Sequence, residues 1–130
     1  MAKQFTLGKN ERLKSRKSIE KLFNEGKSFT ASPFRVYYLQ GKFEISPLQF
    51  GVGVSIKNFK KAVDRNRIKR LTKEAYRVQK LSLQQQLREQ KKQLNVFFIY
   101  TGKELPEYKD IYSKMNLILS KLEKIIAEVN

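Results

Sequence analysis

Clustered cations are the residues of this sequence that most clearly predict a chemistry. Residues 57–80 contain ten Lys or Arg and two acids, so these 24 residues carry a formal charge of +8, half of the +16 of the whole chain. A surface that only contacts solvent usually mixes both signs of charge. The planar fork of N–H donors on Arg also fits phosphate. The stretch therefore favours binding of a polyanion, with a solvated basic face as the alternative.

Several catalytic chemistries are excluded by composition. The chain has no Cys and no His. This excludes a nucleophile–base pair built on Cys or His, a His general base and a zinc site with His or Cys ligands. The twelve acidic residues are scattered, and their spacing resembles no paired set of metal ligands, although folding could still bring some together. We therefore expect no catalytic residue and no metal-binding motif on this protein.

The basic stretch is predicted to form a helix over residues 60–78, because neither Gly nor Pro interrupts it. At about 100° per residue, four apolar residues should lie on one face and pack on a core. These residues are Ile68, Leu71, Ala75 and Val78. Cations should follow one another at i, i+4 on the opposite face. They are Arg65, Lys69, Lys73 and Arg77, with Asn66 and Arg70 beside them.

The remaining elements form a mixed pattern of helices and strands. Ser15 and Gly26 have the residue types of an N-cap and a C-terminal signal, which predicts a short helix over 16–25. Strands are expected at 34–40, at about 48–56 and, apolar on both faces, at 95–101. A long amphipathic helix should follow Pro106 and pack on the domain, with a coiled-coil dimer as the alternative.

Two further stretches are less regular, one before these elements and one between them. Residues 1–14 form a basic lead with no predicted helix or strand. Residues 79–94 form a polar, Gln-rich connection, in which Ser82 could cap a second short helix with Leu83 and Leu87 on one side. We expect little function from this connection.

The strand at 48–56 has one bulky face and one bare face. Gly51 and Gly53 alternate with larger apolar residues, and Gly inside a strand often marks close approach by a ligand or another backbone. The bare face, next to Arg35 and Tyr37 of the preceding strand, therefore offers room for a ligand. Simple packing of another element against these small residues is the alternative.

Composition limits the class of protein. A chain of 130 residues with 40% hydrophobic residues predicts one domain over 1–130. No apolar run approaches 18 residues, and residues 1–14 lack the apolar stretch of a secretory signal. The excess of basic residues points to nucleic acid or an anionic membrane surface. The absence of Cys agrees with the cytoplasm, where we expect the protein.

The stretch AVDRNRIKR, residues 62–70, resembles the Arg-Asn-Arg signature of the protein subunit of bacterial ribonuclease P. Upstream, the stretches ERLKSRKSIEKLFNEGKSF, PFRVYYL and QFGVGVSIKNFKKAV resemble that family's helix, strand and strand. Downstream, NVFFIYTGKE resembles its last strand. The resemblance extends from about residue 5 to residue 127. It implies an α/β (α+β) two-layer sandwich: a small mixed sheet, a short N-terminal helix, the basic helix and a long C-terminal helix. It also implies a left-handed strand–helix–strand crossover, opposite to the usual rule.

The resemblance further implies a division of labour. The RNA subunit would carry the active site and hold Mg²⁺, and the protein would be non-catalytic by itself. The protein would support endonucleolytic removal of the 5′ leader from precursor tRNA by binding both RNAs. Catalytic RNA would contact the basic helix at Lys61, Arg65, Asn66, Arg67, Lys69, Arg70 and Lys73. The leader would lie in a cleft formed by Ile19, Phe23, Arg35, Tyr37 and Lys57. Ile19 departs from the family's aromatic residue, so an apolar contact is expected at that position in place of stacking.

Two other classes share the basic helix. A ribosomal or other structural RNA-binding protein would show the same charge without any role in cleavage. A DNA-binding protein would place the helix in a major groove. The strands expected before the helix argue against that second class, which is typically a short helix-turn-helix or a dimer.

Overall fold

The computed structural model describes residues 12–13, 15–41 and 47–128. Most of the basic lead, which we expected at residues 1–14, therefore lies outside the described residues. The elements follow one another in the order α1 (Arg16–Glu25), β1 (Lys27–Ala31), β2 (Phe34–Gly41), β3 (Leu48–Val54), α2 (Ala62–Gln79), α3 (Leu81–Glu89), β4 (Gln93–Tyr100) and α4 (Tyr108–Glu128). No helix among the described residues combines the length and the apolar character needed to cross a membrane.

The sheet is mixed, as expected, and has the strand order β1-β2-β4-β3. β2 pairs antiparallel with both β1 and β4, whereas β3 and β4 are parallel neighbours connected through α2 and α3. The left-handed sense of this connection stays a prediction. β1 was not predicted, because its five residues, KSFTA, show no strong apolar alternation and gain their place by pairing with β2.

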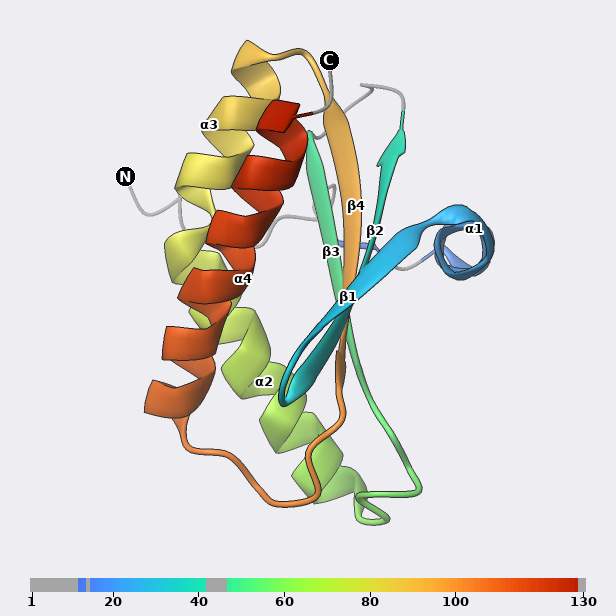
Figure 1. Cartoon of the computed structure of the whole chain (residues 1–130). Helices are drawn as coiled ribbons and strands as arrows, with labels where there is room; N and C mark the ends of the chain where they lie inside the picture. Colours follow the sequence, from blue (N-terminus) through green and yellow to red (C-terminus); the bar gives the residue numbers. More distant parts are fainter. Residues whose placement is uncertain (1–11, 14, 42–46, 129–130) are drawn as a thin grey trace.

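Helices cover the two faces of the sheet unequally (Figure 1). α2, α3 and α4 form a layer on one face, and α1 lies on the other. Side chains alternate along the strands accordingly, so that Phe34 and Val36 of β2 and Val96 and Phe98 of β4 are buried in the core beneath the helical layer. The two-layer sandwich is therefore confirmed, with α1 added on the opposite face.

The long helix α4 packs on the domain, as predicted. Its apolar stripe is buried in the common core. The stripe consists of Ile111, Met115, Ile118, Leu119, Leu122 and Ile126. At the other end of the chain, Ser15 caps α1 as expected, since its Oγ accepts a hydrogen bond from the Ser18 N–H.

The predicted core face of the basic helix was partly wrong. Ile68 and Ala75 are buried and the half-buried Leu71 packs against the core, as predicted. The fully buried set, however, also contains Thr72 and Tyr76, whereas Val78 is only half-buried. The Thr72 hydroxyl donates a hydrogen bond of 2.8 Å to the Ile68 carbonyl, so its polar atom is satisfied inside the helix. The Tyr76 ring stacks on Phe50 of β3 at 4.0 Å between centroids. This stacking turns α2 toward β3.

The Gln-rich connection is an ordered part of the helical layer. α3 forms within it, although Ser82 lies inside the helix and does not cap it. Gln79 and Gln86 donate hydrogen bonds of 3.1 and 2.8 Å to the α4 carbonyls of Tyr112 and Glu123. The polar side chains in this stretch therefore attach α2 and α3 to α4, a tertiary role that the sequence pattern did not reveal.

Candidate nucleic-acid interface

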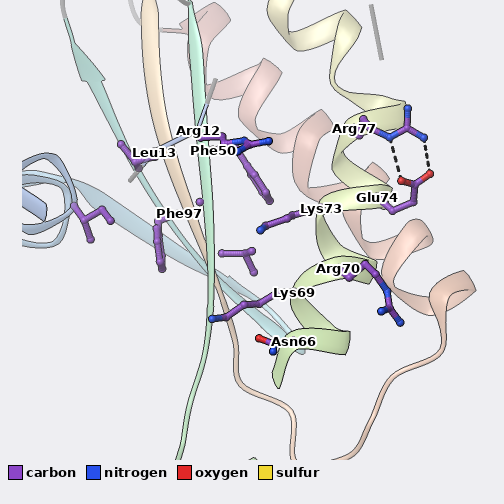
Figure 2. A pocket seen from close by; sticks show the side chains of 13 residues that line it. Arg12, Leu13, Phe50, Asn66, Lys69, Arg70, Lys73, Glu74, Arg77 and Phe97 are labelled. Atoms are coloured by element: carbon purple, nitrogen blue, oxygen red, sulfur yellow. Dashed lines mark hydrogen bonds and ion pairs between the residues drawn. The ribbon is translucent and has the colours of Figure 1, made fainter. Parts of the chain in front are cut away.

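An open groove of about 1160 Å³ lies between α2 and the edge of the sheet formed by β3 (Figure 2). On the sheet side it is lined by Phe50, Gly51 and Val52 of β3, together with Phe97 of β4. α2 supplies the other side with Asn66, Lys69, Arg70, Lys73, Glu74 and Arg77. Four of the residues predicted to bind catalytic RNA thus share one groove: Asn66, Lys69, Arg70 and Lys73.

The charge of this groove is strongly positive. Lys69, Arg70 and Lys73 form no ion pair with any carboxylate of residues 12–13, 15–41 and 47–128. Glu74, the single acid in the groove lining, accepts two hydrogen bonds from Arg77, of 3.0 and 2.6 Å. These bonds lower the pKa of the Glu74 carboxyl and raise that of the Arg77 guanidinium. The acid is therefore neutralised by its own neighbour and leaves the other cations available to a ligand.

The remaining residues predicted to bind catalytic RNA lie around the start of α2. Lys61 and Arg67 are exposed. Arg65 is half-buried, and its Nη1 donates hydrogen bonds of 2.8 Å to the Phe59 carbonyl and 2.9 Å to the Lys60 carbonyl. Arg65 thus fixes the loop that precedes α2, a role that charge counting did not reveal. Its Nε and Nη2 groups make no such bonds to the described residues.

An aromatic cluster lies on the opposite face of the sheet, beneath α1. The Phe23 ring meets Tyr37 edge to face at 4.8 Å and Phe97 at 5.4 Å between centroids. The Arg35 guanidinium carbon lies 5.6 Å from the Tyr37 ring centroid. Three of the residues predicted to bind the leader, Phe23, Arg35 and Tyr37, therefore come together as the sequence indicated.

The other two residues of that predicted set take no part in the ring contacts of the cluster. Ile19 of α1 is half-buried and lines the groove beside α2. Lys57 lies in the loop after β3, where its backbone N–H donates to the Ser55 hydroxyl at 3.1 Å. Among the described residues, no hydrogen bond, ion pair or cation–π contact joins Lys57 to the aromatic cluster.

The glycine face of β3 is not bare, contrary to expectation, because the Phe97 ring covers it. A Cβ atom added to Gly51 would lie 2.7 Å from Phe97 Cδ2, and one added to Gly53 would lie 3.1 Å from Phe97 Cε1. The two glycines therefore accommodate a ring from the neighbouring strand. Sequence reasoning missed Phe97, although its position in an apolar strand that pairs with a glycine-containing strand was a usable signal.

Carboxylates do not gather in the described part of the chain. Among residues 12–13, 15–41 and 47–128, no group of three or more His, Cys, Asp or Glu is arranged to hold a metal ion.

Comparison with known proteins places the chain in one family. The model of the ribonuclease P family matches residues 7–123. The ribonuclease P protein component of Porphyromonas gingivalis W83 is 37% identical over 119 residues, which cover 91% of this chain and 87% of that protein. The corresponding protein of Clostridium botulinum Langeland is 33% identical over 114 residues, covering 87% of this chain and 95% of that protein.

Solved structures of ribonuclease P proteins support the same family assignment. The RNase P protein of Staphylococcus aureus superimposes with a TM-score of 0.70 at 25% identity, covering 92% of this chain and 96% of that one. The RNase P protein of Thermotoga maritima gives a TM-score of 0.68 at 26% identity, with coverage of 85% and 96%. The chain therefore belongs to the ribonuclease P protein family.

Proposed function

We propose that this protein supports the 5′ maturation of tRNA by binding the catalytic RNA of ribonuclease P and the 5′ leader of precursor tRNA. Membership of the ribonuclease P protein family carries the general role, as a component of the endoribonuclease that acts on tRNA precursors. The same membership argues against a ribosomal or other structural RNA-binding protein. The four-stranded sheet that supports α2 also argues against a helix-turn-helix DNA-binding protein.

The observation that carries the proposal is that three cations of α2, Lys69, Arg70 and Lys73, form no ion pair with a carboxylate in the described part of the chain. Lys69 and Lys73 lie one helical turn apart, and without a partner their repulsion disfavours the helix. Phosphate groups would remove that repulsion, and contacts to phosphate position a protein on RNA without reading its sequence. Catalytic RNA therefore suits this side of α2, with Lys61, Asn66 and Arg67 as further contacts at its N-terminal end.

The aromatic cluster suits a single-stranded leader. Proteins that bind single strands combine cations with aromatic rings on which bases stack. Phe23 is 41% exposed, so part of its ring is open to a base, and Arg35 lies beside Tyr37. Phe97 meets the Phe23 ring edge to face and lies opposite Tyr37 on the neighbouring strand, and Ile19 offers an apolar surface at the nearby groove.

The catalytic step belongs to the RNA in this proposal. Mg²⁺ would be held mainly by the RNA subunit, and the complex would act in the cytoplasm. The purified protein, free of RNA, should therefore not cleave precursor tRNA at any Mg²⁺ concentration. Cleavage that copurifies with the protein after nuclease treatment and refolding would contradict this division of labour.

The decisive experiment measures cleavage of precursor tRNA by the catalytic RNA at low Mg²⁺, with and without the protein. The protein should accelerate cleavage, and a variant that carries Gln at positions 69, 70 and 73 should not. A matched control replaces Lys103, Lys109 and Lys124, three exposed cations away from the groove. Each lost phosphate contact should flatten the salt dependence of binding by about 0.7–0.9 units of log–log slope. Equal behaviour of the two variants would place the RNA contact elsewhere.

A further inference from the structure

We propose that Arg12 is a phosphate-binding residue, and that a single-stranded segment of RNA lies in the groove between Arg12 and α2. This inference rests on the proposed function and adds a second cationic side to the RNA interface. Sequence analysis assigned no role to Arg12, since it falls in the basic lead. Its position in the tertiary structure is what points to one.

Arg12 is held in place by pairing with the edge of the sheet. It forms a parallel bridge with Phe50 of β3, and the following residue, Leu13, donates its N–H to the Phe50 carbonyl at 2.8 Å. The Leu13 side chain is buried, with 5% of its surface exposed. A cation on a fixed backbone loses less conformational freedom on binding than one on a mobile segment.

Gly51 permits this attachment. A Cβ atom at Gly51 would lie 3.1 Å from the Leu13 carbonyl oxygen and 2.7 Å from the Phe97 ring. The absence of a side chain therefore lets the segment that carries Arg12 and the ring beneath the groove approach β3 together.

The Arg12 side chain faces the cations of α2. Figure 2 shows Arg12 pointing from the sheet edge toward α2, whereas Lys69 and Lys73 point from α2 toward the sheet. Arg12 is exposed and forms no ion pair with any carboxylate among residues 12–13, 15–41 and 47–128. Cations that approach from two sides fit a ligand with negative charge along its length.

The form of the groove indicates a segment of RNA strand. Its volume of about 1160 Å³ exceeds the roughly 300–1,000 Å³ of small-molecule pockets, and it is open. On the α2 side of β3, Val52 offers an apolar surface against which a ribose or an unstacked base could lie, and Asn66 offers an amide to sugar or backbone. Phosphates would then meet Arg12 on one side and the α2 lysines on the other.

The test compares Arg12→Gln with Arg88→Gln, which removes the same charge from an exposed position of α3 outside the groove. Both proteins are first checked by thermal melting. Binding is then measured at constant Mg²⁺ between 50 and 200 mM monovalent salt. Arg12→Gln should flatten the log–log slope of affinity against salt by about 0.7–0.9 units. The ratio of wild-type to Arg12→Gln affinity should therefore fall about threefold between 50 and 200 mM salt. Arg88→Gln should leave the slope close to that of the wild type.

Three binding arms identify the source of the strand: catalytic RNA alone, the assembled complex with leader-bearing precursor tRNA, and the complex with mature tRNA. If Arg12→Gln flattens the slope with catalytic RNA alone, the strand belongs to that RNA. If it flattens the slope only with precursor tRNA, the strand is the leader. Suppose that the wild-type protein still accelerates cleavage. Equal salt slopes of binding for Arg12→Gln and Arg88→Gln in all three arms would then overturn the inference. Absence of that acceleration in the wild type would instead refute the proposed function.

Discussion

Arg65→Lys separates two roles that the structure gives to one residue. The substitution keeps the positive charge, which serves the RNA, but replaces the planar guanidinium by a compact ammonium. The guanidinium donates from Nη1 to the carbonyls of Phe59 and Lys60 at 2.8 and 2.9 Å. A lysine ammonium on a flexible stem should not reproduce both bonds, so the loop before α2 should loosen.

The free energy that Arg65→Lys should remove follows from these two hydrogen bonds. A bond from a charged donor contributes about 1.5–3 kcal/mol when buried. One of these two bonds is only part-buried and the other is exposed, so the pair should contribute about 2 kcal/mol at most. A loss of about 1.4 kcal/mol makes opening of the loop tenfold more frequent.

Amide hydrogen exchange of the free protein reports this opening. The Phe59 N–H donates to the Ser55 carbonyl at 3.0 Å and lies inside the loop, so its exchange should be about tenfold faster in Arg65→Lys. Arg67→Lys is the matched control, because Arg67 is exposed. Affinity for catalytic RNA should fall more in Arg65→Lys than in Arg67→Lys, since the loop carries Lys57, Lys60 and Lys61. Unchanged Phe59 exchange in Arg65→Lys would refute the positioning role.

Three further predictions concern the aromatic cluster and the groove. Tyr37→Ala should weaken binding of leader-bearing precursor tRNA roughly tenfold, because base stacking contributes about 1–3 kcal/mol, and should spare mature tRNA; equal losses in a binding assay would make Tyr37 structural. Gly53→Val should lower the melting temperature, because overpacking against Phe97 costs about 1–3 kcal/mol; an unchanged melting curve would contradict the packing described. Glu74→Gln should tighten catalytic RNA binding about two- to threefold at low salt, with a smaller gain at high salt, because it removes the acid beside Arg77; unchanged affinity in a titration at 50 mM salt would contradict the assigned electrostatics.

The periodic elements were predictable because their signals are local. The cap at Ser15, the alternation in β2 and β3 and the three- and four-residue spacing in α4 each depend on neighbours within a few residues. The concentration of charge in α2 is likewise a property of the sequence. These signals located the elements, and the resemblance carried by the Arg-Asn-Arg signature implied the two-layer sandwich and the family.

Pairing between distant segments was decided only by the tertiary structure. β1 has a weak pattern and exists through its ladder with β2, so no local signal could place it. The Phe97 ring covers Gly51 and Gly53 because the parallel register of β3 and β4 pairs Phe97 with Gly51, and Gly53 follows two residues later on the same face. The register between strands decides which residues line the same ligand site. Spacing along the sequence does not reveal that register.

The cations illustrate the same division most clearly. Sequence by itself determined that α2 is basic, but all its cations look equivalent in a charge count. Tertiary structure leaves Lys69 and Lys73 open to a ligand, pairs Arg77 with Glu74 and uses Arg65 to hold a loop. It also carries Arg12 across to face them, through backbone pairing with Phe50, 38 positions further along the chain. Charge is a property of each residue, whereas the partner that neutralises or directs it is fixed by the fold.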